Sequence, residues 1–180
     1  MRIGILGSGL MGGKLGTLFA RAGHEVVFSY ARSEQKLKRL ARGAGKRARA
    51  GTPAHAARES DVLLLAVHWT RVNDVLKQAG ALRSKTVVSC SLPMNASDTA
   101  LVVAHTSSGA EVLARWLRGA HFVSAFGTVP SVLSLILSPV IVFLVIFTSV
   151  TAPVRSFLFV TAPFLSCLVP TLLSGNVNWA

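Results

Sequence analysis

The stretch 1-MRIGILGSGLMGGKLG-16 decides how the rest of this chain is interpreted. Residues 2–6 form a short apolar run that is typical of a buried strand, and a helix-compatible segment begins at residue 10. Between them stand three glycines in the spacing G-x-G-x-x-G, namely Gly7, Gly9 and Gly12. The spacing alone is weak evidence, but it predicts a dinucleotide-binding turn when a strand precedes it and a helix begins within it.

Each of these glycines has a physical role in that interpretation. Gly7 lets the chain turn tightly after the strand, Gly9 leaves room for a pyrophosphate against the backbone, and Gly12 lets the helix pack closely. The pyrophosphate would lie over the helix N-terminus, where free N–H groups and the helix dipole favour an anion. The alternative is a strand-to-helix turn that binds nothing.

Strand-like and helix-like segments alternate through the first 126 residues, which predicts βαβ units. We therefore expect an α/β fold, a Rossmann doubly wound parallel sheet, as one domain over residues 1–130. The expected strands are residues 2–6, 24–30, 46–52, 61–67, 85–92 and 121–126, and the expected helices are residues 10–22, 33–45, 53–60, 70–80 and 107–119.

The end of the second expected strand indicates which dinucleotide would bind. An Asp or Glu there favours the free ribose hydroxyl of NAD, whereas an Arg accommodates the 2′-phosphate of NADP. Residues 28–33 contain no acid, and they offer the hydroxyl of Ser29 and the guanidinium of Arg32. Lys36 adds a further positive charge one turn later. The sequence therefore predicts NADP as the cofactor.

The chain is strongly basic, with 19 Lys and Arg against 7 Asp and Glu. A run of bases over residues 36–49 is interpreted mainly as a solvated helix face, whose field also favours the approach of NADP(H). Nucleic acid is not expected as a partner, because neither a recognition helix nor an aromatic platform accompanies the charges. Cys90 and Cys167 are too few and too far apart for a metal site, and we expect a cytoplasmic protein without a signal peptide.

The amino-acid composition changes at residue 131. Residues 131–180 form an atypical apolar tail that contains one charge, Arg155. Three accounts are open: a membrane segment over residues 132–150, an out-of-frame translation product, or a hydrophobic segment for homo-oligomer formation. We prefer the second account, because the tail mixes apolar residues with Ser, Thr and Pro and shows neither helix nor strand periodicity.

Four stretches resemble the family of NADPH-dependent reductases of the deazaflavin coenzyme F420, within the superfamily that includes the pyrroline-5-carboxylate reductases. They are IGILGSGLMGGKLGTLFARAGHEVVFSYAR, AGTPAHAARESDVLLLAVHWTRVNDVL, SLPMN and VSAFGTVPS, which lie between residues 3 and 131. The resemblance implies hydride transfer between NADP(H) and a deazaflavin or another small acceptor. We name no catalytic residue, because the two cofactors carry that chemistry themselves.

The resemblance also implies roles for eight residues in three groups. They are Ser8, Leu10 and Met11 beside the pyrophosphate, Ser29 and Arg32 at the 2′-phosphate, and Ala66, Val67 and His68 on the nicotinamide side.

The chain departs from the family at three places. The family usually has Pro at the position of His68 and Asn at the position of Gly127, and a charged segment where this chain has its apolar tail. His68 is either a proton relay or substrate contact, or a structural residue at the end of a strand. Two alternative functions follow from the tail: a membrane-anchored NADPH-dependent reductase, or a truncated nucleotide-binding protein without catalysis.

Overall fold

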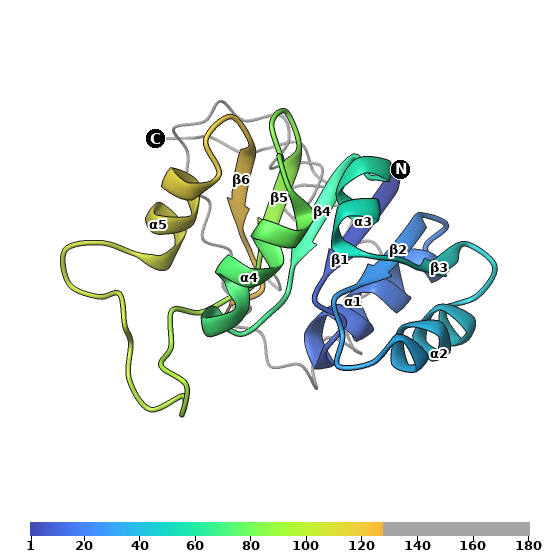
Figure 1. Cartoon of the computed structure of the whole chain (residues 1–180), viewed down its shortest axis with the longest axis horizontal. Helices are drawn as coiled ribbons and strands as arrows, with labels where there is room; N and C mark the ends of the chain where they lie inside the picture. Colours follow the sequence, from blue (N-terminus) through green and yellow to red (C-terminus); the bar gives the residue numbers. More distant parts are fainter. Residues whose placement is uncertain (128–180) are drawn as a thin grey trace, which may run out of the picture.

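The computed structural model of the chain describes residues 1–127 (Figure 1). The expected domain end at residue 130, the tail over 131–180 and the candidate membrane segment over 132–150 all lie outside the described residues. Among the helices of residues 1–127, none has the length and apolar character required to cross a bilayer.

Six parallel strands form one sheet in the order β3-β2-β1-β4-β5-β6. The chain builds outward from β1 to β3 and then returns to the other side of β1, which places the topological switch between β1 and β4. This is the predicted Rossmann order. The strands are β1 (Arg2–Leu6), β2 (Glu25–Ser29), β3 (Ala48–Ala50), β4 (Val62–Leu65), β5 (Thr86–Ser89) and β6 (His121–Ser124).

Five helices cover the two faces of this sheet (Figure 1). Apolar side chains of α1 and α2 pack with one face around Ile5 and Phe28, and those of α3, α4 and α5 pack with the other around Leu63 and Leu65. Strand β4 is buried along its whole length, as its continuous apolar run predicts. The helices are α1 (Leu10–Arg21), α2 (Glu34–Ala44), α3 (Pro53–Glu59), α4 (Trp69–Ala79) and α5 (Gly109–Trp116).

The predicted elements are all present, with boundaries that differ by a few residues. The third strand is shortened to Ala48–Ala50, which lies at the edge of the sheet and pairs only with β2. Ser33 is the N-cap of α2, and its side chain accepts a hydrogen bond from the N–H of Lys36. Ser108 is the N-cap of α5 and forms a capping box with Glu111.

Candidate cofactor-binding edge

The turn after β1 requires glycine at two of its three predicted positions. Gly7 has a φ of +115°, and a Cβ there would lie 2.4 Å from the carbonyl oxygen of Ala66. A Cβ on Gly12 would lie 1.9 Å from the carbonyl oxygen of Gly7. These two glycines therefore let α1 begin directly against the turn and the end of β4.

Gly9 differs from both, because a Cβ at this position would meet no described atom within 4 Å. It is the N-cap of α1 and provides no side-chain hydrogen bond, so the first-turn N–H groups of Leu10, Met11 and Gly12 have no acceptor within the helix. The other four helices of residues 1–127 each have a side-chain cap, from Ser33, Thr52, His68 and Ser108. The start of α1 is thus an open, positively polarised backbone site that fits a pyrophosphate.

Ser8 and Ser29 connect this turn to the end of β2. Both side chains are fully buried. The Ser8 hydroxyl donates to the Ser29 carbonyl oxygen at 2.9 Å, and the Ser29 hydroxyl donates to the Ile5 carbonyl oxygen at 2.7 Å. In this arrangement the two hydroxyls fix the turn against the sheet. The phosphate contact expected of Ser29 stays a prediction, and it requires this hydroxyl to leave Ile5.

Two positive side chains follow β2 at the same edge of the sheet. Arg32 is exposed, and Lys36 is half-buried in the first turn of α2. Neither side chain forms a hydrogen bond or an ion pair with another residue of the part described, whereas the neighbouring Lys38 pairs with Glu34 at 2.6 Å. Arg32 and Lys36 are therefore available for an anionic group of a ligand.

Tyr30 fixes the path of the chain between β2 and these cations. Its φ is +55°, its carbonyl oxygen accepts a hydrogen bond from the N–H of Ser8 at 3.0 Å, and its hydroxyl donates to the carboxylate of Asp74. Burial and this hydrogen bond raise the pKa of Tyr30, and the same hydrogen bond lowers the pKa of Asp74. No local pattern in the sequence predicts this contact, because Asp74 follows Tyr30 by 44 residues.

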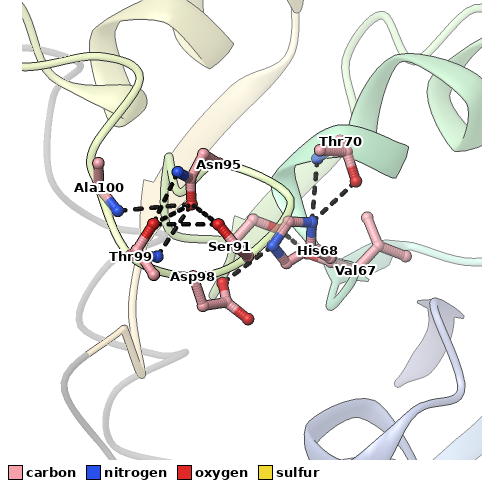
Figure 2. A network of polar contacts seen from close by, with 9 residues as sticks. Val67, His68, Thr70, Ser91, Asn95, Asp98, Thr99 and Ala100 are labelled. Carbon is pink, nitrogen blue, oxygen red and sulfur yellow. Dashed lines mark hydrogen bonds and ion pairs between the residues drawn. The ribbon is translucent and has the colours of Figure 1, made fainter.

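At the end of β4 the chain presents Ala66, Val67 and His68, and all three are half-buried. Figure 2 shows Val67 and His68. His68 is the N-cap of α4: its Nδ1 accepts the N–H of Thr70 at 3.3 Å and lies 2.8 Å from the Thr70 hydroxyl. Its Nε2 lies 2.9 Å from a carboxylate oxygen of Asp98. We assign the ring proton to Nε2, which donates to Asp98, because Nδ1 faces two donors.

The long connection between β5 and α5 is anchored to this strand end. The Ser91 hydroxyl donates to the carbonyl oxygen of Val67 at 2.7 Å, and Asp98 reaches His68 (Figure 2). Asn95 organises the loop internally, since its side-chain oxygen accepts the N–H of Thr99 at 2.9 Å. Figure 1 shows the connection extending away from the body of the sheet. Its exposed apolar side chains, Leu92, Leu101 and Val102, lie outside any described core.

Other features of residues 1–127 contribute no chemistry to this edge. Cys90 is largely buried, and burial raises the pKa of its thiol to about 12, so the reactive thiolate is scarce at neutral pH. Among residues 1–127 no three His, Cys, Asp or Glu side chains gather as metal ligands. A cavity of about 320 Å³ lies between α4 and α5 near Leu76, Arg83 and Trp116, away from the glycine turn.

Comparison with solved structures supports the fold. The chain is similar to a proposed F420-dependent NADP reductase from Arthrobacter sp. FB24, with 24% identity, a TM-score of 0.64, and coverage of 74% of this chain and 65% of that chain. The chain is also similar to a hypothetical protein from Sinorhizobium meliloti, with 22% identity, a TM-score of 0.65, and coverage of 74% of this chain and 64% of that chain. A reductive aminase from Aspergillus terreus in complex with NADPH and ethyl levulinate is a third similar structure. It has 23% identity and a TM-score of 0.53, and the match covers 68% of this chain and 39% of that chain. The chain spans slightly less than two thirds of the first two relatives.

The family is shown by a direct match of sequence to a family model. The model described as NADP oxidoreductase, coenzyme F420-dependent, matches residues 2–93. The matched region includes the glycine turn, the end of β2 and the end of β4, and it covers just over half of the chain. The protein therefore belongs to the family of coenzyme F420-dependent NADP oxidoreductases, whose cofactor is NADP.

Proposed function

We propose that this chain binds NADPH along the carboxyl edge of its sheet and transfers a hydride between NADP(H) and a deazaflavin. One observation carries the proposal: the uncapped N-terminus of α1, with open space at Gly9, lies at the same sheet edge as an exposed Arg32 that has no partner in residues 1–127. A dinucleotide with a third phosphate matches this pair of open sites, because one site suits a pyrophosphate and the other suits a 2′-phosphate.

The first-turn N–H groups of Leu10, Met11 and Gly12 would hold the pyrophosphate, with Ser8 fixing the turn from beneath. The guanidinium of Arg32 would hold the 2′-phosphate. A charge-assisted hydrogen bond of this kind contributes about 1.5–3 kcal/mol, so its loss is expected to reduce affinity by roughly 10- to 100-fold.

Lys36 and Ser29 are the secondary contacts of this phosphate. The ammonium group of Lys36 adds charge without fixed geometry. Ser29 would contribute only after its hydroxyl exchanged the Ile5 carbonyl oxygen for a phosphate oxygen. Arg32 therefore carries most of the expected preference for NADPH over NADH.

NADPH, when bound, supplies a hydride, and a deazaflavin is a suitable acceptor of one. The chain's own contribution is to orient the nicotinamide and to enclose it. Ala66 and Val67 would line the nicotinamide side, and the Ser91 hydroxyl holds the carbonyl oxygen of Val67 in place. His68 caps α4 and contacts Asp98, and these two contacts support a structural role that joins the end of β4 to the β5–α5 connection. We assign no side chain to proton transfer.

Turnover of an added deazaflavin tests this function. The full chain is mixed with NADPH and oxidised coenzyme F420, and the absorbance of both is followed; we expect NADPH oxidation that depends on the deazaflavin. The Gly9→Val variant, in which the cofactor site is filled, serves as the inactive control. Binding of NADPH without turnover would instead indicate a nucleotide-binding protein without catalysis. Absence of NADPH binding would contradict the whole proposal.

A further inference from the structure

We infer that Asp74 on α4 is a positioning residue for cofactor choice: through the Tyr30 hydroxyl it fixes the turn that carries Arg32, and so it contributes to the preference for NADPH over NADH. The inference rests on the proposed function, because it concerns the same cofactor site. It assigns a role to a helix that lies on the opposite face of the sheet from α1 and α2.

The backbone of Tyr30 adopts a conformation that needs external support. A φ of +55° is left-handed, and a large side chain rarely occupies that region unless its surroundings hold it there. Tyr30 is also the first residue after β2, so its conformation sets the direction in which the chain leaves the sheet. Arg32 follows only two residues later.

Contacts from two separate elements provide this support. The N–H of Ser8, in the glycine turn, donates to the Tyr30 carbonyl oxygen at 3.0 Å. The Tyr30 ring packs against the core cluster on the α4 side of the sheet, and its hydroxyl donates to Asp74. Tyr30 therefore connects the expected pyrophosphate site directly to α4.

Asp74 is itself held in place on α4. Its second carboxylate oxygen accepts a hydrogen bond from the side-chain amide of Gln78, one turn later, at 3.1 Å. The charge of the nearby Arg71 favours the ionised carboxylate, which is the stronger acceptor for a phenol. By contrast, the Arg32 side chain has no partner in the described part of the chain, so the backbone of the turn is what determines where its guanidinium lies.

The test measures the dissociation constants of NADPH and NADH for the full chain and its variants. Tyr30→Phe and Asp74→Ala remove the two ends of the same hydrogen bond. Each is expected to lower the affinity for NADPH about five-fold and to leave the affinity for NADH unchanged. The double variant should be no weaker than either single variant, since both remove one interaction. Asp74→Asn retains an acceptor and should restore part of the preference. Asn73→Ala, on the same helix, is the matched control and should change neither constant.

A further comparison asks whether Asp74 acts through Arg32. In an Arg32→Ala background, Asp74→Ala should no longer change the affinity for NADPH. Equal losses for both cofactors would show a general structural role and overturn the inference, and so would an unchanged NADPH preference in Asp74→Ala. If the wild-type chain does not bind NADPH more tightly than NADH, the cofactor assignment itself fails. If the wild-type chain prefers NADPH and Asp74→Ala keeps that preference, only the inference about Asp74 fails.

Discussion

The two edges of the sheet differ in whether their positively charged side chains have partners. At the amino edge the Arg2 guanidinium pairs with Asp61 at 2.8 Å, and the Lys85 ammonium donates to the Ser60 carbonyl oxygen at 2.7 Å. At the carboxyl edge Arg32 has no partner among residues 1–127, and nothing described lies within 4 Å of a Cβ on Gly9. The cations Arg2 and Lys85 of the amino edge are used within the protein, whereas Arg32 at the carboxyl edge is available to a ligand.

This difference follows from the direction of the strands. In a parallel sheet with crossover helices, every strand ends where the next helix begins, so the carboxyl edge collects strand ends and helix N-termini together. The other helices of residues 1–127 have side-chain caps, and α1 alone among them does not. The missing cap thus distinguishes the proposed ligand site from the other helix starts of residues 1–127.

The largest expected effect comes from filling the open space at the carboxyl edge. Gly9→Val should lower NADPH affinity more than about 100-fold, because the branched side chain would occupy the place of the pyrophosphate. The fold should survive, since Gly9 has a φ of −79° and a Cβ there would meet no atom of residues 1–127 within 4 Å. Titration with NADPH and circular dichroism measure the two properties separately.

Gly43→Val is the matched control, because Gly43 is also an open position but lies on α2 away from the turn. It should bind NADPH normally. Normal NADPH affinity in a folded Gly9→Val variant would show that the glycine turn does not bind the cofactor.

An intermediate effect is expected from removing the unpaired cation. Arg32→Ala should weaken the binding of NADPH by about 2 kcal/mol, or roughly 30-fold in affinity, because only NADPH has the 2′-phosphate. The affinity for NADH should stay nearly unchanged. Isothermal titration with both cofactors measures the difference. Arg39→Ala, which removes another exposed cation from α2, is the control. Equal losses for NADPH and NADH would contradict the assignment of Arg32.

The smallest effect is expected at the amino edge. Hydrogen bonds from Arg2 lower the pKa of Asp61, so the pair stabilises the folded state above about pH 4 and loses this contribution as the pH falls through the lowered value. Arg2→Ala should lower the urea midpoint slightly at neutral pH, the difference from the wild type should shrink as the pH falls below about 4, and NADPH affinity should stay unchanged. A change in NADPH affinity would mean that the two edges are not independent.

The local parts of this site could be predicted from the sequence. The glycine spacing, the cap at Ser33 and the absence of an acid after β2 depend on neighbouring residues, and the strand order follows from the alternation of elements. The contacts of Tyr30 with Asp74 and of His68 with Asp98 span 44 and 30 residues and arise only when α4 and the β5–α5 connection reach their places. Such pairs leave no local pattern.

The direction of the Ser29 hydroxyl could not be predicted from the sequence either. Its position in the sequence suits a phosphate ligand, but position does not give the direction of a hydroxyl. In the folded chain that hydroxyl is fully buried and donates to Ile5. Whether the group binds phosphate depends on a rearrangement, and the residue type alone contains no information about it.

Hydrogen exchange of backbone amides, with and without saturating NADPH, tests whether the carboxyl edge is the cofactor site. We expect slower exchange at residues 7–12 and 30–36, where the pyrophosphate and the 2′-phosphate would lie, and unchanged exchange at residues 58–61 and 83–85 of the amino edge. Protection confined to the amino edge or to the cavity between α4 and α5, or no protection at the glycine turn in a chain saturated with NADPH, would contradict this placement of the cofactor.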